Sequence, residues 1–133
     1  MEPTNVLPIA AILSLVTVEF GGWALLGFLT GREGPSDWQR SFFRAGHAHA
    51  GVLLVLSLVY LLYLPRADFS NALEWLAGGV LLAGVLAQSG GFFLHLGLGQ
   101  PDTPSAGTRL TRVGAIFIAV AFVMLAVGLI QTA

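Results

Sequence analysis

The sequence predicts an all-α protein, an integral membrane bundle of four transmembrane helices. Of the 133 residues, 56% are hydrophobic and only 10% are charged, whereas a typical soluble domain has roughly a quarter charged residues. The mean hydropathy is +0.82. Four separate apolar runs are each about long enough to cross a hydrocarbon core of ~30 Å at ~1.5 Å per residue.

The expected spans are residues 6–29, 45–64, 73–98 and 113–130. The segment before the first span has no positive charge, so we expect this span to be retained rather than cleaved as a signal peptide. Ser36 or Asp37 is expected to cap a short interfacial helix before the second span. Proline and glycine residues end the second and third spans. We therefore expect residues 1–133 to form a single four-helix domain.

The charges are few and unevenly placed. The chain has six arginines, no lysine and a formal net charge of −1, so it lacks the basic surface that nucleic acid requires. It has no cysteine, which excludes disulfides and thiolate metal sites. Five arginines lie in or beside the first and third connectors, whereas only Arg66 lies in the second. We therefore expect a protein of the cell membrane with its arginine-rich side in the cytoplasm and both termini on the outer side.

The three histidines are expected at one depth near the cytoplasmic boundary, because antiparallel neighbours place His95 beside His47 and His49. Arg44 and Arg112 are expected at or just outside this level. A two-residue step turns a helix by ~200°, so His47 and His49 should face opposite sides, with His47 nearer the bundle interior. This spacing disfavours a three-histidine zinc or copper site. Haem fits better, because it needs one or two axial imidazoles, an apolar slot and cations for its propionates.

A second polar layer is expected deeper in the bilayer, formed by Glu19, Ser57, Gln88 and Ser89. An acid at the centre of a membrane helix costs roughly 2.5–3.5 kcal/mol on the insertion scale. Glu19 is therefore expected to face protein or a hydrated cavity. There it is either hydrogen-bonded to Gln88 or active as a proton carrier or substrate contact.

Small residues in the third span recur every four positions and predict a ridge on which another helix packs. This predicted ridge consists of Gly79, Ala83, Ala87, Gly91 and, continuing it, His95. The aromatic residues Trp23, Phe92 and Phe93 are expected in the core or in the wall of an apolar pocket.

Several short motifs, spread over most of the chain, resemble styrene oxide isomerase and, more distantly, hydroxylaminobenzene mutase. The run RAGHAHAG at residues 44–51 is similar to the Arg-Ala-His-Ser-Gly run that begins the second helix of the isomerase. The runs GGW at 21–23, PSDW at 35–38 and QSGGFFL at 88–94 also have similar counterparts.

The resemblance implies a homotrimer with haem b at each subunit interface and His49, facing the neighbouring subunit, as the iron ligand. It implies an enzyme that rearranges a small lipophilic epoxide by Lewis-acid catalysis. Two positions depart from the family. Val55 stands where the isomerase has an asparagine, and Phe93 stands where it has a catalytic tyrosine.

The candidate site residues fall into three groups. The candidate haem contacts are His47, His49, His95, Arg44 and Arg112, with His49 as the metal ligand; the candidate catalytic residues are Glu19 and Gln88; and the candidate pocket residues are Trp23, Phe92 and Phe93.

Other classes of function stay open. Glu19 occupies the place of the lone glutamate in the small multidrug resistance transporters, which predicts a small proton-coupled transporter. His95 opposite a histidine of the second span would instead give a haem or electron-transfer accessory subunit. The glutathione-linked eicosanoid enzymes also have four helices and an arginine-alanine start to the second, but share few further positions.

Overall fold

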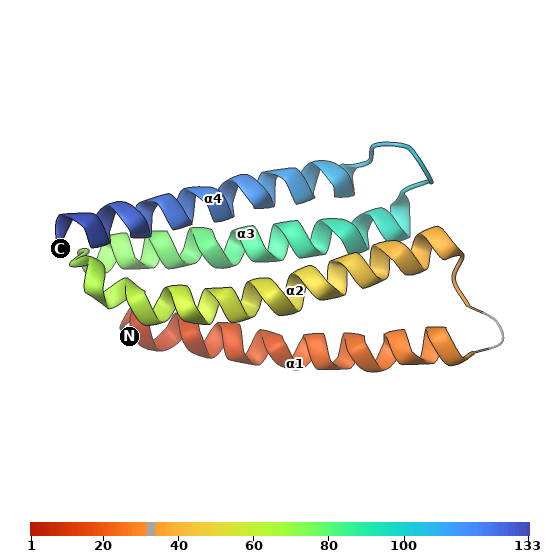
Figure 1. The fold of residues 1–133 in the computed structure, drawn as a ribbon, viewed down its shortest axis with the longest axis horizontal. Coiled ribbons are helices and arrows are strands. Elements are labelled where there is room, and N and C mark those ends of the chain that lie inside the picture. The colour runs from red at the N-terminus through yellow and green to blue at the C-terminus, as the bar shows by residue number, and fades with distance from the viewer. Residues whose placement is uncertain (32–33) are drawn as a thin grey trace.

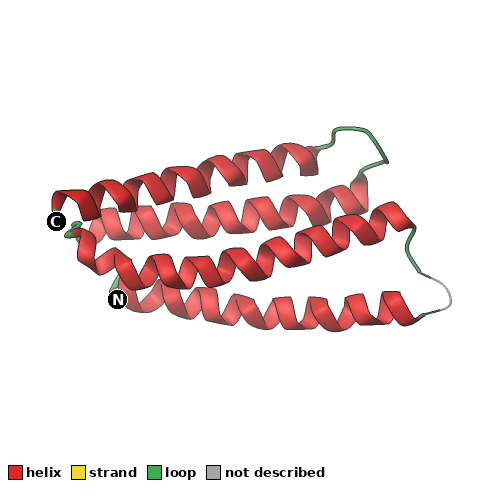
Figure 2. Ribbon diagram, in the orientation of Figure 1, coloured by secondary structure: helices red, strands yellow, loops and turns green. Residues whose placement is uncertain are grey.

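The computed structural model is helical along nearly all of the residues that it describes, 1–31 and 34–133. The helices are α1 (Pro3–Thr30), α2 (Asp37–Tyr63), α3 (Asn71–Leu98) and α4 (Ala106–Gln131), with a short 3-10 turn, η1 (Leu64–Ala67), after α2. They run up and down the molecule, and both chain termini lie at the same end (Figure 1). The connecting loops are confined to the two ends (Figure 2). Arg32, one of the connector arginines, lies outside the described residues.

Each of these four helices is long and apolar enough to cross a membrane. The prediction of an all-α bundle with four potential membrane spans is therefore confirmed. The first, third and fourth expected spans fall within α1, α3 and α4, and the second, 45–64, ends one residue past α2, in η1.

Two helices begin well before their apolar runs, because capping residues rather than hydropathy set their starts. The Ser36 main-chain N–H donates to Gln39 Oε1 at 3.0 Å at the start of α2. Ser105 Oγ accepts from the main-chain N–H groups of Gly107 at 3.1 Å and Thr108 at 3.4 Å at the start of α4. The expectation of a separate interfacial helix at Ser36 is wrong. Residues 37–44 contain neither proline nor glycine and continue directly into α2.

Helices α3 and α4 pack together more closely than any other pair. A β-carbon added at Gly114 would lie 2.2 Å from the Gln88 main-chain nitrogen, and one at Gly107 would lie 2.4 Å from the His95 main-chain nitrogen. Small buried residues recur here at every seventh position, a period that keeps one helix face against its neighbour. We call this contact the α3–α4 seam: Ala77, Gly84 and Gly91 of α3 with Gly107, Gly114 and Ala121 of α4.

The ridge predicted at four-residue spacing is therefore mostly wrong. A β-carbon at Gly79 would meet no atom within 4 Å, and Ala83 is exposed. Gly91 and His95 do face α4, as their contacts with Gly107 show. The four-residue spacing drifts around the helix over several turns, whereas the seven-residue spacing stays on one face.

Helix α1 lies at the edge of the bundle, on the opposite side from α4 (Figure 1). Near its N-terminus, Asn71 Nδ2 donates a hydrogen bond to Glu2, and Leu7 fills the space over Gly78. Elsewhere α1 packs mainly on α2 and exposes many of its large apolar side chains.

Candidate functional site

The three histidines contact three different neighbours. His47 lies over Gly21 and Gly22 of α1, where an added β-carbon at Gly21 would be 3.2 Å from His47 Nδ1. His49 lies against Phe92 of α3, with 4.9 Å between ring centroids. The prediction that these two histidines face opposite sides is confirmed. The prediction that only His47 faces the bundle, with His49 turned toward a neighbouring subunit, is wrong, because His47 packs on α1 and His49 on α3 of the same subunit.

The expectation that all three histidines share one depth is wrong. His95 stacks on Phe42, with 4.4 Å between ring centroids. Phe42 precedes His49 on α2 by about two helical turns. Within the described parts of the chain, no three His, Asp or Glu side chains are placed to hold a metal ion together. A chelate built from all three histidines is therefore not formed in this subunit.

His49 is held in the form that a metal-ligating histidine requires. Its Nδ1 lies 2.8 Å from the main-chain oxygen of Ala45. A carbonyl oxygen only accepts hydrogen bonds, so Nδ1 carries the hydrogen and the lone pair is on Nε2. Metal-bound histidines are oriented in the same way, by donating their other ring N–H to a carbonyl or carboxylate.

His95 is bonded to a side chain instead of the main chain. Ser105 Oγ lies 2.7 Å from His95 Nδ1 and accepts from the main-chain N–H groups of Gly107 and Thr108. The Ser105 hydroxyl therefore joins the His95 ring to the first turn of α4.

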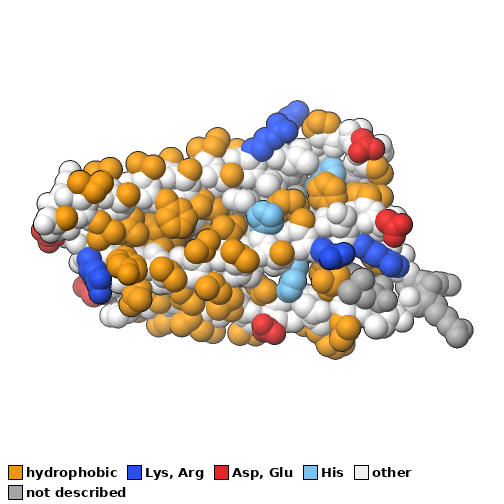
Figure 3. Space-filling model, in the orientation of Figure 1, with side chains coloured by type: hydrophobic (Ala, Val, Ile, Leu, Met, Phe, Trp, Pro, Cys, Tyr) orange, Lys and Arg blue, Asp and Glu red, His pale blue; other side chains and the backbone are white. Residues whose placement is uncertain are grey.

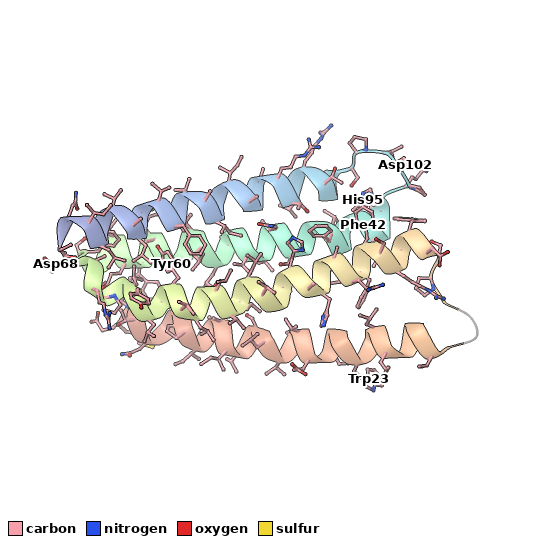
Figure 4. All side chains as sticks on the ribbon, in the orientation of Figure 1. Trp23, Phe42, Tyr60, Asp68, His95 and Asp102 are labelled. Atoms are coloured by element: carbon pink, nitrogen blue, oxygen red, sulfur yellow. The ribbon has the colours of Figure 1, made fainter. Side chains whose placement is uncertain are left out.

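The surroundings of His95 also favour a structural role. The residue is only 2% exposed and is enclosed by Trp38 and Phe42. His95 and Phe42 lie together at the end of the bundle where residues 99–105 connect α3 to α4 (Figure 4). Its bond to Ser105 joins the last turn of α3 to the N-cap of α4.

A continuous run of rings connects His49 with His95. Phe92 contacts both His49 and Phe42, and Phe42 contacts His95. Arg112, Thr108 and Thr111 of α4 join Phe42, Phe92 and His95 around a cavity of about 190 Å³. Of the candidate haem contacts, the structure thus gathers His49, His95 and Arg112 around Phe42 and Phe92.

The deeper candidate residues are not gathered. Glu19 is exposed on α1, so the interior of this subunit is not the protein environment that it was expected to face. The main-chain oxygen of Gln88 accepts from Thr111 Oγ1 at 3.2 Å, which places Gln88 on the α4 side of α3. α1 lies at the edge of the bundle away from α4, so Glu19 and Gln88 do not form the expected pair.

The side chains of the other two predicted pocket aromatics, Trp23 and Phe93, do not lie in the same site as that of Phe92. Trp23 is 71% exposed and projects from α1 away from the other helices (Figure 4). It pairs with Phe20 on the surface instead of lining the core. Phe93 packs edge-on against Phe43, with 5.4 Å between centroids, and borders a different cavity between α1, α2 and α3.

The arginines gather near the two connectors that precede α2 and α4. Arg44 is exposed on the first turns of α2, and Arg109 and Arg112 are exposed on the first turns of α4. Figure 3 shows this end of the surface with most of the visible basic side chains, and shows the histidines as separate patches. Arg66 lies near the opposite end, with its guanidinium 4.9 Å from the Tyr63 ring centroid.

The sequence interpretation missed Ser105, Thr108 and Thr111. Ser105 followed three positions later by a hydroxyl residue resembles a capping box, and this signal was available from the sequence. Its second partner, His95, is ten residues away and was visible only once α3 and α4 were placed side by side.

The fold defines the class of the protein, over the residues that the structure describes, as an α-helical protein with four helices that are long and apolar enough to cross a membrane. No protein-family model matches the chain, and no curated protein or solved structure shows significant similarity to it.

Proposed function

We propose that this is a membrane-embedded haem b protein with His49 as its axial ligand. We further propose that it is an isomerase that rearranges a small lipophilic substrate, as the resemblance to styrene oxide isomerase implies. The observation that carries the proposal is the hydrogen bond between His49 Nδ1 and the Ala45 oxygen, because it leaves the Nε2 lone pair available.

The residues around His49 are compatible with haem. One axial imidazole, an apolar face and nearby cations are the requirements. Phe92 supplies part of the apolar face. Arg44, five positions before His49, and Arg112, beside Phe92, would pair with the propionates. His95 is not a second ligand in this proposal, because its ring is enclosed by Trp38 and Phe42 and bonded to Ser105.

Haem iron, when bound, supplies a Lewis acid for the oxygen of a strained ring. Phe92 lies against the His49 ring, and an apolar site of this kind would exclude water from a reactive substrate. Val55 and Phe93 offer no polar side chain at the two positions that depart from the family. Substrate orientation therefore relies on shape and apolar contact, which favours a different substrate from styrene oxide.

The proposal includes a homotrimer in the cell membrane. Glu19 is exposed on α1 within the apolar stretch, and covering it with a neighbouring subunit would avoid its exposure to hydrocarbon. The arginine distribution supports placing the 31–36 and 99–105 connectors in the cytoplasm. A mass measurement in detergent that gives a single subunit would contradict the trimer.

Haem content tests the proposal directly. Protein purified from haem-supplied cells is assayed as its pyridine haemochrome, for wild type, His49→Ala and His47→Ala. His47 is the matched control, because it lies two residues away and is also half-buried. We expect the wild type and His47→Ala to contain haem and His49→Ala to lose most of it. Colourless wild-type protein, or loss with His47→Ala alone, would overturn the assignment.

A further inference from the structure

A second, larger cavity lies between α1, α2 and α3, apart from the rings around His49. Its volume is about 560 Å³, within the range of roughly 300–1,000 Å³ that small-molecule sites occupy. The lining is mostly apolar, from residues such as Leu54 and Phe93, and includes no histidine. Leu86 at its border is 76% exposed, so the cavity opens on the surface that the bilayer covers.

Three hydroxyl groups line this cavity, and two of them are satisfied locally. Ser14 Oγ donates to the Ala10 oxygen at 2.8 Å, and Thr17 Oγ1 donates to the Ser14 oxygen at 2.6 Å. The third, Ser89, is only 6% exposed, and its Oγ has no hydrogen-bond partner among the residues that the structure describes. A buried hydroxyl without a partner is unfavourable, and more so where no water is present.

The unpaired state of Ser89 contrasts with the other buried serine of the spans. Ser57 is fully buried, and its Oγ donates to the Leu53 oxygen at 2.7 Å, one turn earlier on α2. This bond to the preceding turn is the usual solution for serine in a membrane helix. Ser89 Oγ does not make it, so its O–H is without an acceptor at a residue that lines the cavity.

We propose that this cavity binds a small lipophilic molecule that carries one hydrogen-bond acceptor, such as a carbonyl or ether oxygen, and that Ser89 donates to this acceptor. A phospholipid acyl chain would fill the same volume but has no acceptor, so it leaves Ser89 unpaired. The site is independent of haem at His49, because no histidine lines it.

Benzophenone is a direct probe, since it is small and lipophilic, has a single carbonyl acceptor, and inserts into nearby C–H bonds under ultraviolet light. The full chain in phosphatidylcholine vesicles is labelled, and the modified residues are mapped by mass spectrometry. We expect labelling concentrated on cavity-lining residues of α1 and α3, and several-fold weaker labelling in Ser89→Ala. Ala83→Leu, which narrows the cavity at an exposed position, should also reduce labelling.

Ser57→Ala is the matched control, because it removes a buried serine hydroxyl that does not line the cavity. We expect it to leave labelling unchanged. His49→Ala should also leave labelling unchanged, which separates this proposal from that of haem binding. Ser89→Ala removes an unpaired hydroxyl, so we expect no loss of thermal stability, and weaker labelling would not reflect unfolding. Labelling spread evenly over lipid-facing residues, or labelling equal in wild type and Ser89→Ala, would overturn the proposal.

Discussion

The α3–α4 pair and the α1 edge of the bundle use the same apolar composition in different ways. In α3, 39% of the residues in the most apolar stretch are buried, against 6% in α1. The α3–α4 seam brings backbone against backbone, as at Gly91 and Gly107. α1 instead rests on side chains such as His47 and leaves a cavity between itself, α2 and α3. Hydropathy alone therefore says that a helix spans the bilayer but does not say how tightly it is held.

The division also separates the histidines by role. His95 lies in the closely packed α3–α4 pair, where its ring is enclosed and bonded to Ser105. His47 lies at the α1 edge of the bundle, over two glycines of α1. His49 lies between them, against Phe92, with its Nδ1 bonded to the Ala45 oxygen. The three histidines thus lie in three different packing environments.

The largest loss of unfolding free energy should come from adding a methyl group inside the α3–α4 seam. A β-carbon at Gly114 would lie 2.2 Å from the Gln88 nitrogen, and the backbone cannot move aside as a side chain can. We expect Gly114→Ala to cost about 3 kcal/mol or more of unfolding free energy, measured by denaturation in mixed micelles. Gly79→Ala is the control, since its β-carbon meets nothing within 4 Å. It should be neutral or raise stability by up to about 1 kcal/mol. Equal effects of the two variants would contradict the seam.

An intermediate effect should come from the cap that joins α3 to α4. Ser105→Ala removes the acceptor for two main-chain N–H groups and leaves His95 Nδ1 without its partner. We expect a loss of about 2 kcal/mol in the same measurement. Ser36→Ala changes the N-cap of α2, which is exposed and has no buried partner, and should cost only about 0.5 kcal/mol. If Ser36→Ala is the more damaging of the two, the structural role of His95 is wrong.

The smallest change in unfolding free energy should come from a methyl group added to α1, at the edge of the bundle. At Gly21 an added β-carbon would be 3.2 Å from His47 Nδ1, an atom of a ring that can rotate away. We expect Gly21→Ala to change stability by less than about 0.5 kcal/mol. Gly27→Ala, whose added β-carbon would meet no described atom within 4 Å, should have a similarly small effect on stability. A loss at Gly21 as large as that at Gly114 would show that α1 is held as tightly as α4.

The sequence was sufficient for the four helices because each apolar run is long enough to span a bilayer. It also placed His47 and His49 on opposite faces, since that depends only on helical geometry. The sequence did not predict that Glu19 and Trp23 are exposed in this subunit, nor which residues form the α3–α4 seam. Whether an apolar face meets lipid or another helix depends on packing between helices, and lipid and core residues have the same composition.

The choice between four-residue and seven-residue spacing on α3 shows the same limit. Both patterns are present in the sequence, and Gly79 and Gly84 are equally small. Only the matching glycines of α4, Gly107 and Gly114, select the seven-residue pattern. The partner of Ser105 could not be predicted for the same reason, because His95 reaches it only after α3 and α4 have come together.

The most direct test of the central claim, one histidine ligand at His49, is the electron paramagnetic resonance spectrum of the oxidised protein purified with its haem. If His49 is the only protein ligand, the ferric protein should give a high-spin signal, and this signal should be lost together with the haem in His49→Ala. A low-spin signal that converts to high-spin in His95→Ala would contradict the claim, because it would show that both histidines ligate the iron.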